Sequence, residues 1–185
     1  MKVSHTEIPG PILIEPQSFT DARGSFFESW NRSRYADAGV REAFVQDNVS
    51  HSRRGVLRGL HFQDPNAQGK LISVFGGEIY DVAVDIRVES ATFGRWVGIH
   101  LSAANRAQFY IPPGFAHGFQ VVSAEALVGY KCTAYYDPHA ERSLLWSDPV
   151  LAIDWPLPPI LSEKDRAALT LAELELVPPR EASSR

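Results

Sequence analysis

The segment from residue 55 to residue 74, GVLRGLHFQDPNAQGKLISV, carries several ionisable side chains although its pattern is that of two short strands. Arg58, His61, Gln63 and Lys70 stand there among small apolar residues, with no obvious acid paired with the two cations or the imidazole. An imidazole titrates close to neutral pH and can accept and release protons. Two cations are enough to bind a small anion. The segment is therefore a candidate site for proton transfer on an anionic ligand.

A second landmark is IPPGFAHGF, in which a Pro-x-Gly turn comes three residues before His117. Together with His61-Phe-Gln63 and the later glycines Gly69 and Gly76, it resembles the cupin jelly-roll superfamily. In that superfamily the first segment usually supplies two histidines and a glutamate to a metal, and the second supplies one more histidine. Here Gln63 replaces one ligand and no glutamate follows before Gly76. A first-row metal needs about three converging ligands. We therefore expect no metal, and we expect His61 and His117 to be free to transfer protons.

Composition is that of an ordinary globular protein and is compatible with a small anionic ligand. The chain has 185 residues and a net charge of −4. This length favours one domain over residues 1–185, and the absence of a basic excess argues against nucleic acid as a partner. The N-terminus has no signal-peptide pattern, and no apolar run approaches about 18 residues, so no membrane span is expected. A single cysteine, Cys132, favours a cytoplasmic location.

Short strands separated by turn signals dominate the pattern. Expected strands are ILIE, SFFESW, FVQDNVS, GVLRGLHFQ, KLISVF, EIYDVAVDI, RWVGIHLS, AQFYIPP, AHGFQVVS and ALVGYKCTAYY. Helices are expected at 31–39, with Asn31 as N-cap and Gly39 as stop, and at 162–175, opening with Ser162. The tail from about residue 178 is expected to be flexible. The pattern predicts an all-β sandwich or barrel with a short C-terminal helix.

One strand poses a problem of phase. Arg58 and His61 are an odd number of residues apart, so a regular strand would direct them to opposite faces. If both line one pocket, Gly59 is the position at which a β-bulge can reset the alternation. We therefore predict irregular pairing between residues 58 and 61. In EIYDVAVDI, Asp81 and Asp85 share the face opposite the apolar residues, and we interpret them as solvated or structurally hydrogen-bonded acids.

A narrower resemblance rests on motifs that occur in order from about residue 19 to residue 165. They are FTDARGSFFESW, QDNVSHSRRGVLRGLHFQ, QGKLISVFGGEIYDVAVDIR, TFGRW, IPPGFAHGF, YKCTAYYDPHAE and LSEKD. The set resembles dTDP-4-dehydrorhamnose 3,5-epimerases and related dTDP-4-keto-6-deoxysugar epimerases. The resemblance implies a cupin-type jelly roll (a double-stranded β-helix), a dTDP-sugar substrate, and no cofactor or metal.

The activity that the resemblance implies is inversion at C3 and C5 of dTDP-4-dehydro-6-deoxy-D-glucose, giving dTDP-4-dehydro-L-rhamnose. Each carbon is alpha to the ketone, so loss of its proton gives an enolate that is reprotonated from the other face. By the resemblance, His61 is the base, Asp165 orients it, and Tyr130 is the acid. Lys70 and Arg58 would stabilise charge on the ketone oxygen or the diphosphate.

The resemblance also implies a set of substrate-binding residues and a homodimer. The binding residues are Arg23, Glu28, Gln46, Asn48, Arg58, Lys70, His117, Tyr136, Glu141 and Lys164. Arg23 and Arg58 suit diphosphate oxygens, and Tyr136 is the candidate to stack on thymine. We expect the strand in GPILIEP to cross to the neighbouring subunit, with Arg23 and Glu28 completing that subunit's pocket.

The sequence leaves alternatives open. Phe62 and Ser73 stand where the family often has a tyrosine and a basic residue, which leaves room for a mono-epimerase acting at C3 or C5 only. A metal-dependent cupin oxygenase would need the ligands that Gln63 and the missing glutamate remove. A non-catalytic sugar-nucleotide-binding protein would have no need of His61, Tyr130 and Asp165 together.

Overall fold

The structure is a computed structural model, and it describes residues 1–176. Its elements are β1 (Lys2–His5), β2 (Ile12–Glu15), β3 (Ser18–Asp21), β4 (Gly24–Phe27), α1 (Arg32–Asp37), β5 (Gln46–Arg53), β6 (Leu57–Gln63), β7 (Lys70–Gly76), β8 (Glu78–Asp85), β9 (Trp96–Ser102), β10 (Gln108–Ile111), β11 (Phe115–Val121), β12 (Glu125–Cys132), β13 (Glu141–Ser143) and α2 (Glu163–Arg166). The predicted flexible tail from about residue 178 lies outside the described residues. Within the described part, no helix is long and apolar enough to cross a membrane.

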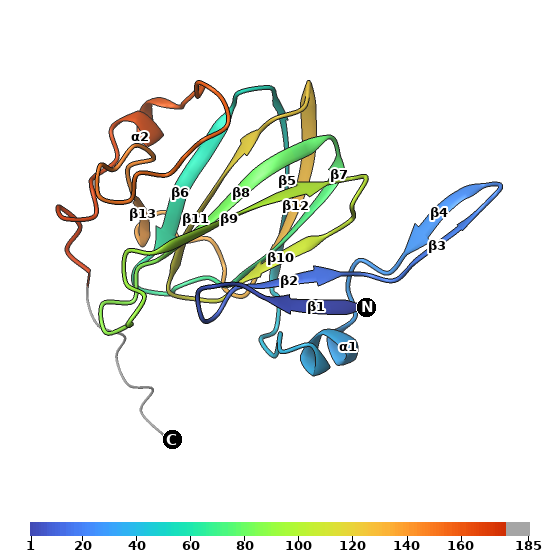
Figure 1. The fold of residues 1–185 in the computed structure, drawn as a ribbon. Helices are drawn as coiled ribbons and strands as arrows, with labels where there is room; N and C mark the ends of the chain where they lie inside the picture. Colours follow the sequence, from blue (N-terminus) through green and yellow to red (C-terminus); the bar gives the residue numbers. More distant parts are fainter. Residues whose placement is uncertain (177–185) are drawn as a thin grey trace, which may run out of the picture.

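Two antiparallel sheets face each other as a jelly roll of the cupin type (Figure 1). One sheet has the order β1-β2-β10-β7-β12-β5, and the other has the order β13-β6-β11-β8-β9. Side chains from both sheets fill the space between them, including Ile72 and Phe109 from the first sheet and Ile79 and Phe119 from the second. Burial of this interior is the main force that holds the two sheets together.

A second apolar layer covers the outer face of the β6-β11-β8 sheet. Val82 and Val84 of β8 pack there with Leu60 of β6, against Leu151 and Ile153 of the C-terminal segment. The alternate β8 residues, Asp81 and Asp85, point inward and are fully buried. Both carboxylates are hydrogen-bonded. The structurally bonded interpretation of these two acids is therefore right, and the solvated one is wrong.

The strands and the first helix largely follow the sequence pattern. α1 begins after Asn31, whose side chain accepts a hydrogen bond from the Arg34 amide, and Gly39 follows the helix with a φ of +102°. The second helix is much shorter than expected, because Leu169 forms a parallel bridge with Leu144 and the chain is extended there. Strands β1, β3 and β13 were not expected from the sequence.

The hairpin of β3 and β4 extends away from the two sheets (Figure 1). Phe19 and Phe26 face each other across it and are 57% and 71% exposed. Strand β2, by contrast, is paired on both edges within its own sheet, with β1 and with β10. The prediction that the GPILIEP strand crosses to a neighbouring subunit is therefore wrong for β2, because neither edge of β2 is free to pair with another chain.

The predicted irregularity at Gly59 is confirmed. His61 pairs with His117 and Arg58 pairs with Phe119, so between these pairs two residues of β6 lie opposite one residue of β11. A Cβ atom at Gly59, whose φ is +110°, would lie 2.5 Å from the carbonyl oxygen of His117. Only glycine fits there. The extra residue puts Arg58 and His61 on the same inward face of β6, while Leu60 points outward.

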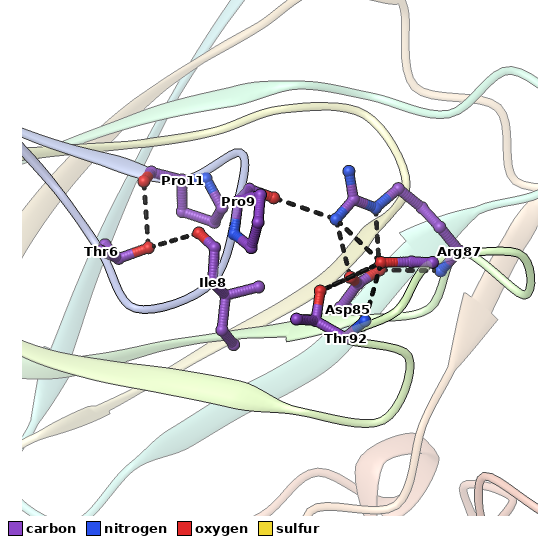
Figure 2. Close-up of polar contacts among 8 residues, drawn as sticks. Thr6, Ile8, Pro9, Pro11, Asp85, Arg87 and Thr92 are labelled. Atoms are coloured by element: carbon purple, nitrogen blue, oxygen red, sulfur yellow. Dashed lines mark hydrogen bonds and ion pairs between the residues drawn. The ribbon is translucent and has the colours of Figure 1, made fainter.

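An ion pair between a half-buried arginine and a buried aspartate holds the loop that follows β8 (Figure 2). The Arg87 guanidinium donates to both oxygens of Asp85, at 2.8 and 2.7 Å, and to the Pro9 carbonyl at 3.0 Å. The Thr92 hydroxyl donates to Asp85 at 2.6 Å. Because Pro9 belongs to the N-terminal loop, these contacts tie the start of the chain to the end of β8.

Candidate active site

A cavity of about 210 Å³ opens between the two sheets and collects most of the predicted site residues. Its lining comprises Gln46, Asn48, His61, Phe62, Gln63, Gln68, Lys70, Tyr130, Cys132, Tyr136 and Glu141. The inward faces of β5, β6, β7 and β12 supply most of these side chains. Residues from the first sheet thus oppose residues from the second across one space.

His61 is held by a carboxylate that comes from far along the chain. Its Nε2 lies 2.5 Å from Oδ1 of Asp165, in the first turn of α2. Ser162, the N-cap of that helix, donates its hydroxyl to Oδ2 of Asp165 and accepts from the Asp165 amide. An ionised carboxylate only accepts hydrogen bonds, so Nε2 carries the proton. This leaves Nδ1 of neutral His61 as the nitrogen that can accept one.

The charge of Asp165 is favoured by these contacts. Burial alone would raise its pKa, but the hydrogen bonds from His61 and Ser162 and the nearby Lys164 charge bring the pKa below its usual value. Asp165 is therefore a carboxylate at neutral pH. A charged partner at Nε2 stabilises the imidazolium that forms when His61 takes up a second proton.

Tyr130 approaches the same cavity from the opposite sheet, on the inward face of β12. Burial raises the pKa of its phenol, as does the nearby Cys132, while the charge of Arg58 works against that rise. The phenol therefore stays protonated at neutral pH and is able to donate. A proton acceptor on one sheet and a proton donor on the other face a common space.

Lys70 lines the cavity, and His117 lies buried near it without lining the cavity. Lys70 is 9% exposed, and its Nζ lies 3.5 Å from the His61 carbonyl oxygen. Burial lowers the pKa of Lys70, while Cys132, Asp81 and Glu141 favour its charged form. Nε2 of His117 lies 3.0 Å from Oδ2 of Asp81, and burial lowers the pKa of His117 and raises that of Asp81.

Polar side chains from three elements are linked at the mouth of the cavity. The hydroxyl of Tyr136 donates to Glu141 at 2.9 Å, and Glu141 forms an ion pair with Lys164 at 2.7 Å. Gln46 accepts from the Tyr136 amide and donates to Asn48. These five predicted binding residues are thus brought together, and Tyr136 remains 52% exposed above them.

Besides His117 and Lys164, three predicted binding residues lie outside the cavity lining. Arg58 lies on the inward face of β6, and its Nε donates to Ser52 of β5 at 3.0 Å. Arg23, at the turn of the β3–β4 hairpin, pairs with Asp21 at 2.6 Å, and Glu28 pairs with Arg34 at 3.2 Å. Within one chain, therefore, Arg23 and Glu28 do not join the other site residues.

Some residues of this site were not singled out as site residues from the sequence. Asp81, Ser52 and Ser162 each hold a predicted site residue by a hydrogen bond. The alternation of β8 puts Asp81 on the face opposite the apolar residues, which was the available signal. Ser162 had a signal as an N-cap, but nothing local linked Ser52 to Arg58. Within residues 1–176, no group of three or more His, Cys, Asp or Glu side chains is arranged to hold a metal ion.

Comparison with known protein families gives a match over most of the chain. The family model described as dTDP-4-dehydrorhamnose 3,5-epimerase matches residues 5–173. A dTDP-4-dehydrorhamnose 3,5-epimerase of Pseudomonas aeruginosa is 52% identical over 181 residues, which cover 96% of this chain and 100% of that protein.

Two solved structures are informative about ligands. The dTDP-6-deoxy-D-glucose-3,5-epimerase of Legionella pneumophila, in complex with dTDP-4-keto-L-rhamnose, superposes with a TM-score of 0.94 at 52% identity and covers 98% of this chain and 99% of its own. A 3'-monoepimerase of Streptomyces bikiniensis, in complex with dTDP-quinovose, superposes with a TM-score of 0.85 at 34% identity, covering 90% and 86%. The chain is thus more similar to the double epimerase than to the monoepimerase.

Proposed function

The chain belongs to the dTDP-4-dehydrorhamnose 3,5-epimerase family, and we propose that it inverts C3 and C5 of dTDP-4-dehydro-6-deoxy-D-glucose to give dTDP-4-dehydro-L-rhamnose. It is thus an isomerase that acts on a sugar nucleotide. The observation that carries the proposal is that His61, bonded to Asp165, and Tyr130 line one cavity from opposite sheets.

The reaction requires a base and an acid on opposite faces of the sugar ring. Nδ1 of His61 takes the proton from the carbon next to the ketone, and the electron pair of the broken C–H bond moves into an enolate. Tyr130 then gives its phenolic proton to the other face of that carbon, which inverts the centre. The raised pKa of Tyr130 supports this role because the phenol is protonated before it acts. Proton exchange with solvent restores both groups.

Negative charge develops on the ketone oxygen during this reaction, and a cation beside it lowers the barrier. Lys70 is the proposed cation, because it is buried beside His61 and the carboxylates of Asp81 and Glu141 favour its charged form. His117, held by Asp81 next to Lys70, is proposed to bind the sugar. No cofactor is needed, since the proton removed and the proton returned balance.

The nucleotide is proposed to lie toward the mouth of the cavity. Tyr136 is exposed there and is the proposed stacking surface for thymine, with Gln46, Asn48, Glu141 and Lys164 beside it. The Arg58 guanidinium, anchored to Ser52, is proposed to bind the diphosphate, because a guanidinium can bond phosphate oxygens with two N–H groups.

We further propose a homodimer in which the β3–β4 hairpin reaches the neighbouring subunit. A two-stranded hairpin is at most marginally stable alone in water, and the exposed Phe19 and Phe26 need a cover. Val49, Phe75 and Leu127 are also exposed on the outer face of the sheet that contains β5, β7 and β12. A second copy that covers these surfaces would receive Arg23 and Glu28 in its own cavity.

Subunit complementation tests the shared site. Arg23→Ala and His61→Ala variants are purified separately, mixed, unfolded and refolded together. If Arg23 serves the partner's cavity, each mixed dimer regains one intact site, and activity returns to about a quarter of the wild-type value. Activity that stays at the level of the separate variants would place Arg23 in its own subunit's site and refute the exchange.

We also propose that the chain works as one domain in the cytoplasm. The family match over residues 5–173 spans both sheets and α2, which supports a single domain. The chain has one cysteine, Cys132, so it can form no internal disulfide, which is typical of proteins in a reducing compartment.

Proton NMR in deuterated buffer tests the reaction. The purified protein is incubated with dTDP-4-dehydro-6-deoxy-D-glucose, and the signals at C3 and C5 are followed. Deuterium at both carbons of the inverted product is the expected result. Deuterium at one carbon only would show that the protein is a mono-epimerase and not a double epimerase. No exchange at either carbon would refute the epimerase proposal.

A further inference from the structure

The loop between β12 and β13 carries Tyr136, and packing alone does not hold that side chain in place. Tyr136 is 52% exposed, and the preceding Tyr135 is 71% exposed. The orientation of an exposed ring depends on the backbone that presents it. The Tyr136 hydroxyl donates to Glu141 at 2.9 Å, and the backbone of the loop sets the position from which the ring reaches that contact above the cavity.

Gln63, at the end of β6, bonds to the backbone on both sides of Tyr136. Its side-chain nitrogen donates to the Tyr135 carbonyl at 3.3 Å and to the Asn66 carbonyl at 2.9 Å, and its side-chain oxygen accepts from the Asp137 amide at 2.9 Å. Gln63 is only 4% exposed. One buried side chain thus joins the loop after β6 to the loop after β12.

Other contacts hold the same two loops together but do not duplicate this one. Gln68 donates to the Ala134 carbonyl at 2.8 Å, and the Thr133 hydroxyl accepts from the Gly69 amide at 2.7 Å. Both contacts involve residues that precede Tyr135 in the chain. Among the described residues, Gln63 is the side chain that bonds to the backbone of both neighbours of Tyr136, while Gln46 bonds to the Tyr136 amide itself.

We propose that Gln63 is a positioning residue for the nucleotide base, acting through Tyr136. It holds the backbone of Tyr135 and Asp137 so that the Tyr136 ring is already in place when the base of the substrate arrives. This inference rests on the proposed function, in which Tyr136 stacks on thymine. A position that holds a metal ligand in many cupins here braces a base-binding loop, because an amide can donate and accept at once.

The consequence for binding follows from the cost of ordering a loop. If Gln63 is removed, the Asp137 amide and the Tyr135 carbonyl lose their partner, and the loop populates several arrangements. Only a fraction of these present the ring correctly, so the apparent affinity for a ligand that uses the ring falls by that fraction. The acid–base pair, His61 and Tyr130, is not part of these bonds, so turnover at saturating substrate is maintained.

The test uses Gln63→Met, which keeps the length of the side chain and removes its polar atoms, with Gln120→Met as the matched control. Gln120 is also buried and makes the same kind of two-bond contact, donating to the Leu157 carbonyl at 2.8 Å and accepting from the Leu157 amide at 3.0 Å, away from the cavity. Calorimetry measures dTDP binding to each variant, alone and combined with Tyr136→Ala. Thermal unfolding of each variant is measured in parallel.

We expect Gln63→Met to weaken dTDP binding by roughly tenfold. A change in affinity of this size corresponds to about the net free energy of one good hydrogen bond, here lost from the preorganised loop. Gln120→Met should lower the melting temperature without this loss. In the Tyr136→Ala background, Gln63→Met should weaken binding little further, because both changes remove the same ring contact. Steady-state kinetics should show a raised KM with kcat within about twofold of wild type.

Other results would overturn the inference. Additive effects of Gln63→Met and Tyr136→Ala, or equal losses of dTDP affinity in Gln63→Met and Gln120→Met, would make Gln63 a general structural residue. If Gln63→Met does not fold, Gln63→Glu replaces it, because this variant keeps the acceptor for the Asp137 amide. Its dTDP affinity is then measured alone and combined with Tyr136→Ala, and the same outcomes support or overturn the inference. Failure of the wild-type protein to bind dTDP would instead overturn the proposed function together with this inference.

Discussion

Asp165 lies 2.5 Å from His61, although the two residues are 104 positions apart in the chain. The contact depends on the C-terminal segment, which packs across the outer face of the β6-β11-β8 sheet and then presents the first turn of α2 to the end of β6. A carboxylate that fixes the imidazole in one protonation pattern is the usual third member of such a site.

Asp165→Asn should therefore lower kcat by about 10²-fold or more, the usual contribution of a well-placed acid–base group. The amide cannot stabilise the imidazolium that forms when His61 removes a proton. Initial rates of product formation measure the effect. The matched control is Glu78→Gln, which removes the charge from the exposed contact with His100 at 2.9 Å and should leave kcat unchanged. Equal rates for Asp165→Asn and wild type would show that His61 does not need its partner.

Gly59→Ala should strongly destabilise the fold, because the new Cβ would lie 2.5 Å from the His117 carbonyl oxygen at a φ of +110°. The matched control is Gly24→Ala, whose φ is +128° but whose Cβ would meet nothing within 4 Å. Urea unfolding of both variants separates the steric contact from the backbone strain. We expect the loss for Gly59→Ala to exceed that for Gly24→Ala by about 2 kcal/mol or more. Equal losses would mean that the bulge does not require close packing of β6 on β11.

The Asp85–Arg87 pair should make stability depend on pH in the acid range (Figure 2). Burial alone would raise the pKa of Asp85, but hydrogen bonds from Arg87, Ser90 and Thr92 lower it from 3.8 to about 2. A carboxyl whose pKa is lower in the folded state stabilises the fold above its unfolded pKa. That contribution is lost as the pH falls from about 4 to about 2, and it is worth about 2 kcal/mol at neutral pH.

Asp85→Asn should remove this contribution. Its free energy of unfolding should fall below that of wild type by about 2 kcal/mol or more at pH 7, and the gap should narrow as the pH approaches 2. Asp47→Asn is the control, because its pair with Lys131 at 2.8 Å is exposed and such pairs are worth little. A gap that stays constant from pH 7 to pH 2 would show that folding does not lower the pKa of Asp85.

Much of the fold was predictable because strand alternation and turn residues are local signals. The phase conflict between Arg58 and His61 is itself enough to predict the bulge at Gly59 from the sequence. The C-terminal segment was not predictable in the same way. Its leucines have helical spacing, but Leu169 pairs with Leu144 and Leu171 packs on the outer layer, so tertiary contacts override the local preference.

The site was predictable in part. Strand pairing places His61 opposite His117, the two histidines that the cupin-like motifs singled out. No local pattern links His61 to Asp165, and only the resemblance supplied that contact. Arg23 and Glu28 lie away from the cavity of their own chain, since the hairpin that carries Arg23 extends from the body (Figure 1).

Separating proton removal from proton return tests the central claim most directly. The Tyr130→Phe and His61→Asn variants are each incubated with substrate in deuterated buffer, and proton NMR follows both exchange and configuration at C3 and C5. We predict that Tyr130→Phe exchanges deuterium into the substrate without inverting it, because His61 still removes a proton and returns a deuteron to the same face. His61→Asn should give neither exchange nor inversion. Inversion at the wild-type rate in Tyr130→Phe, or undiminished exchange in His61→Asn, would contradict the two-sided mechanism.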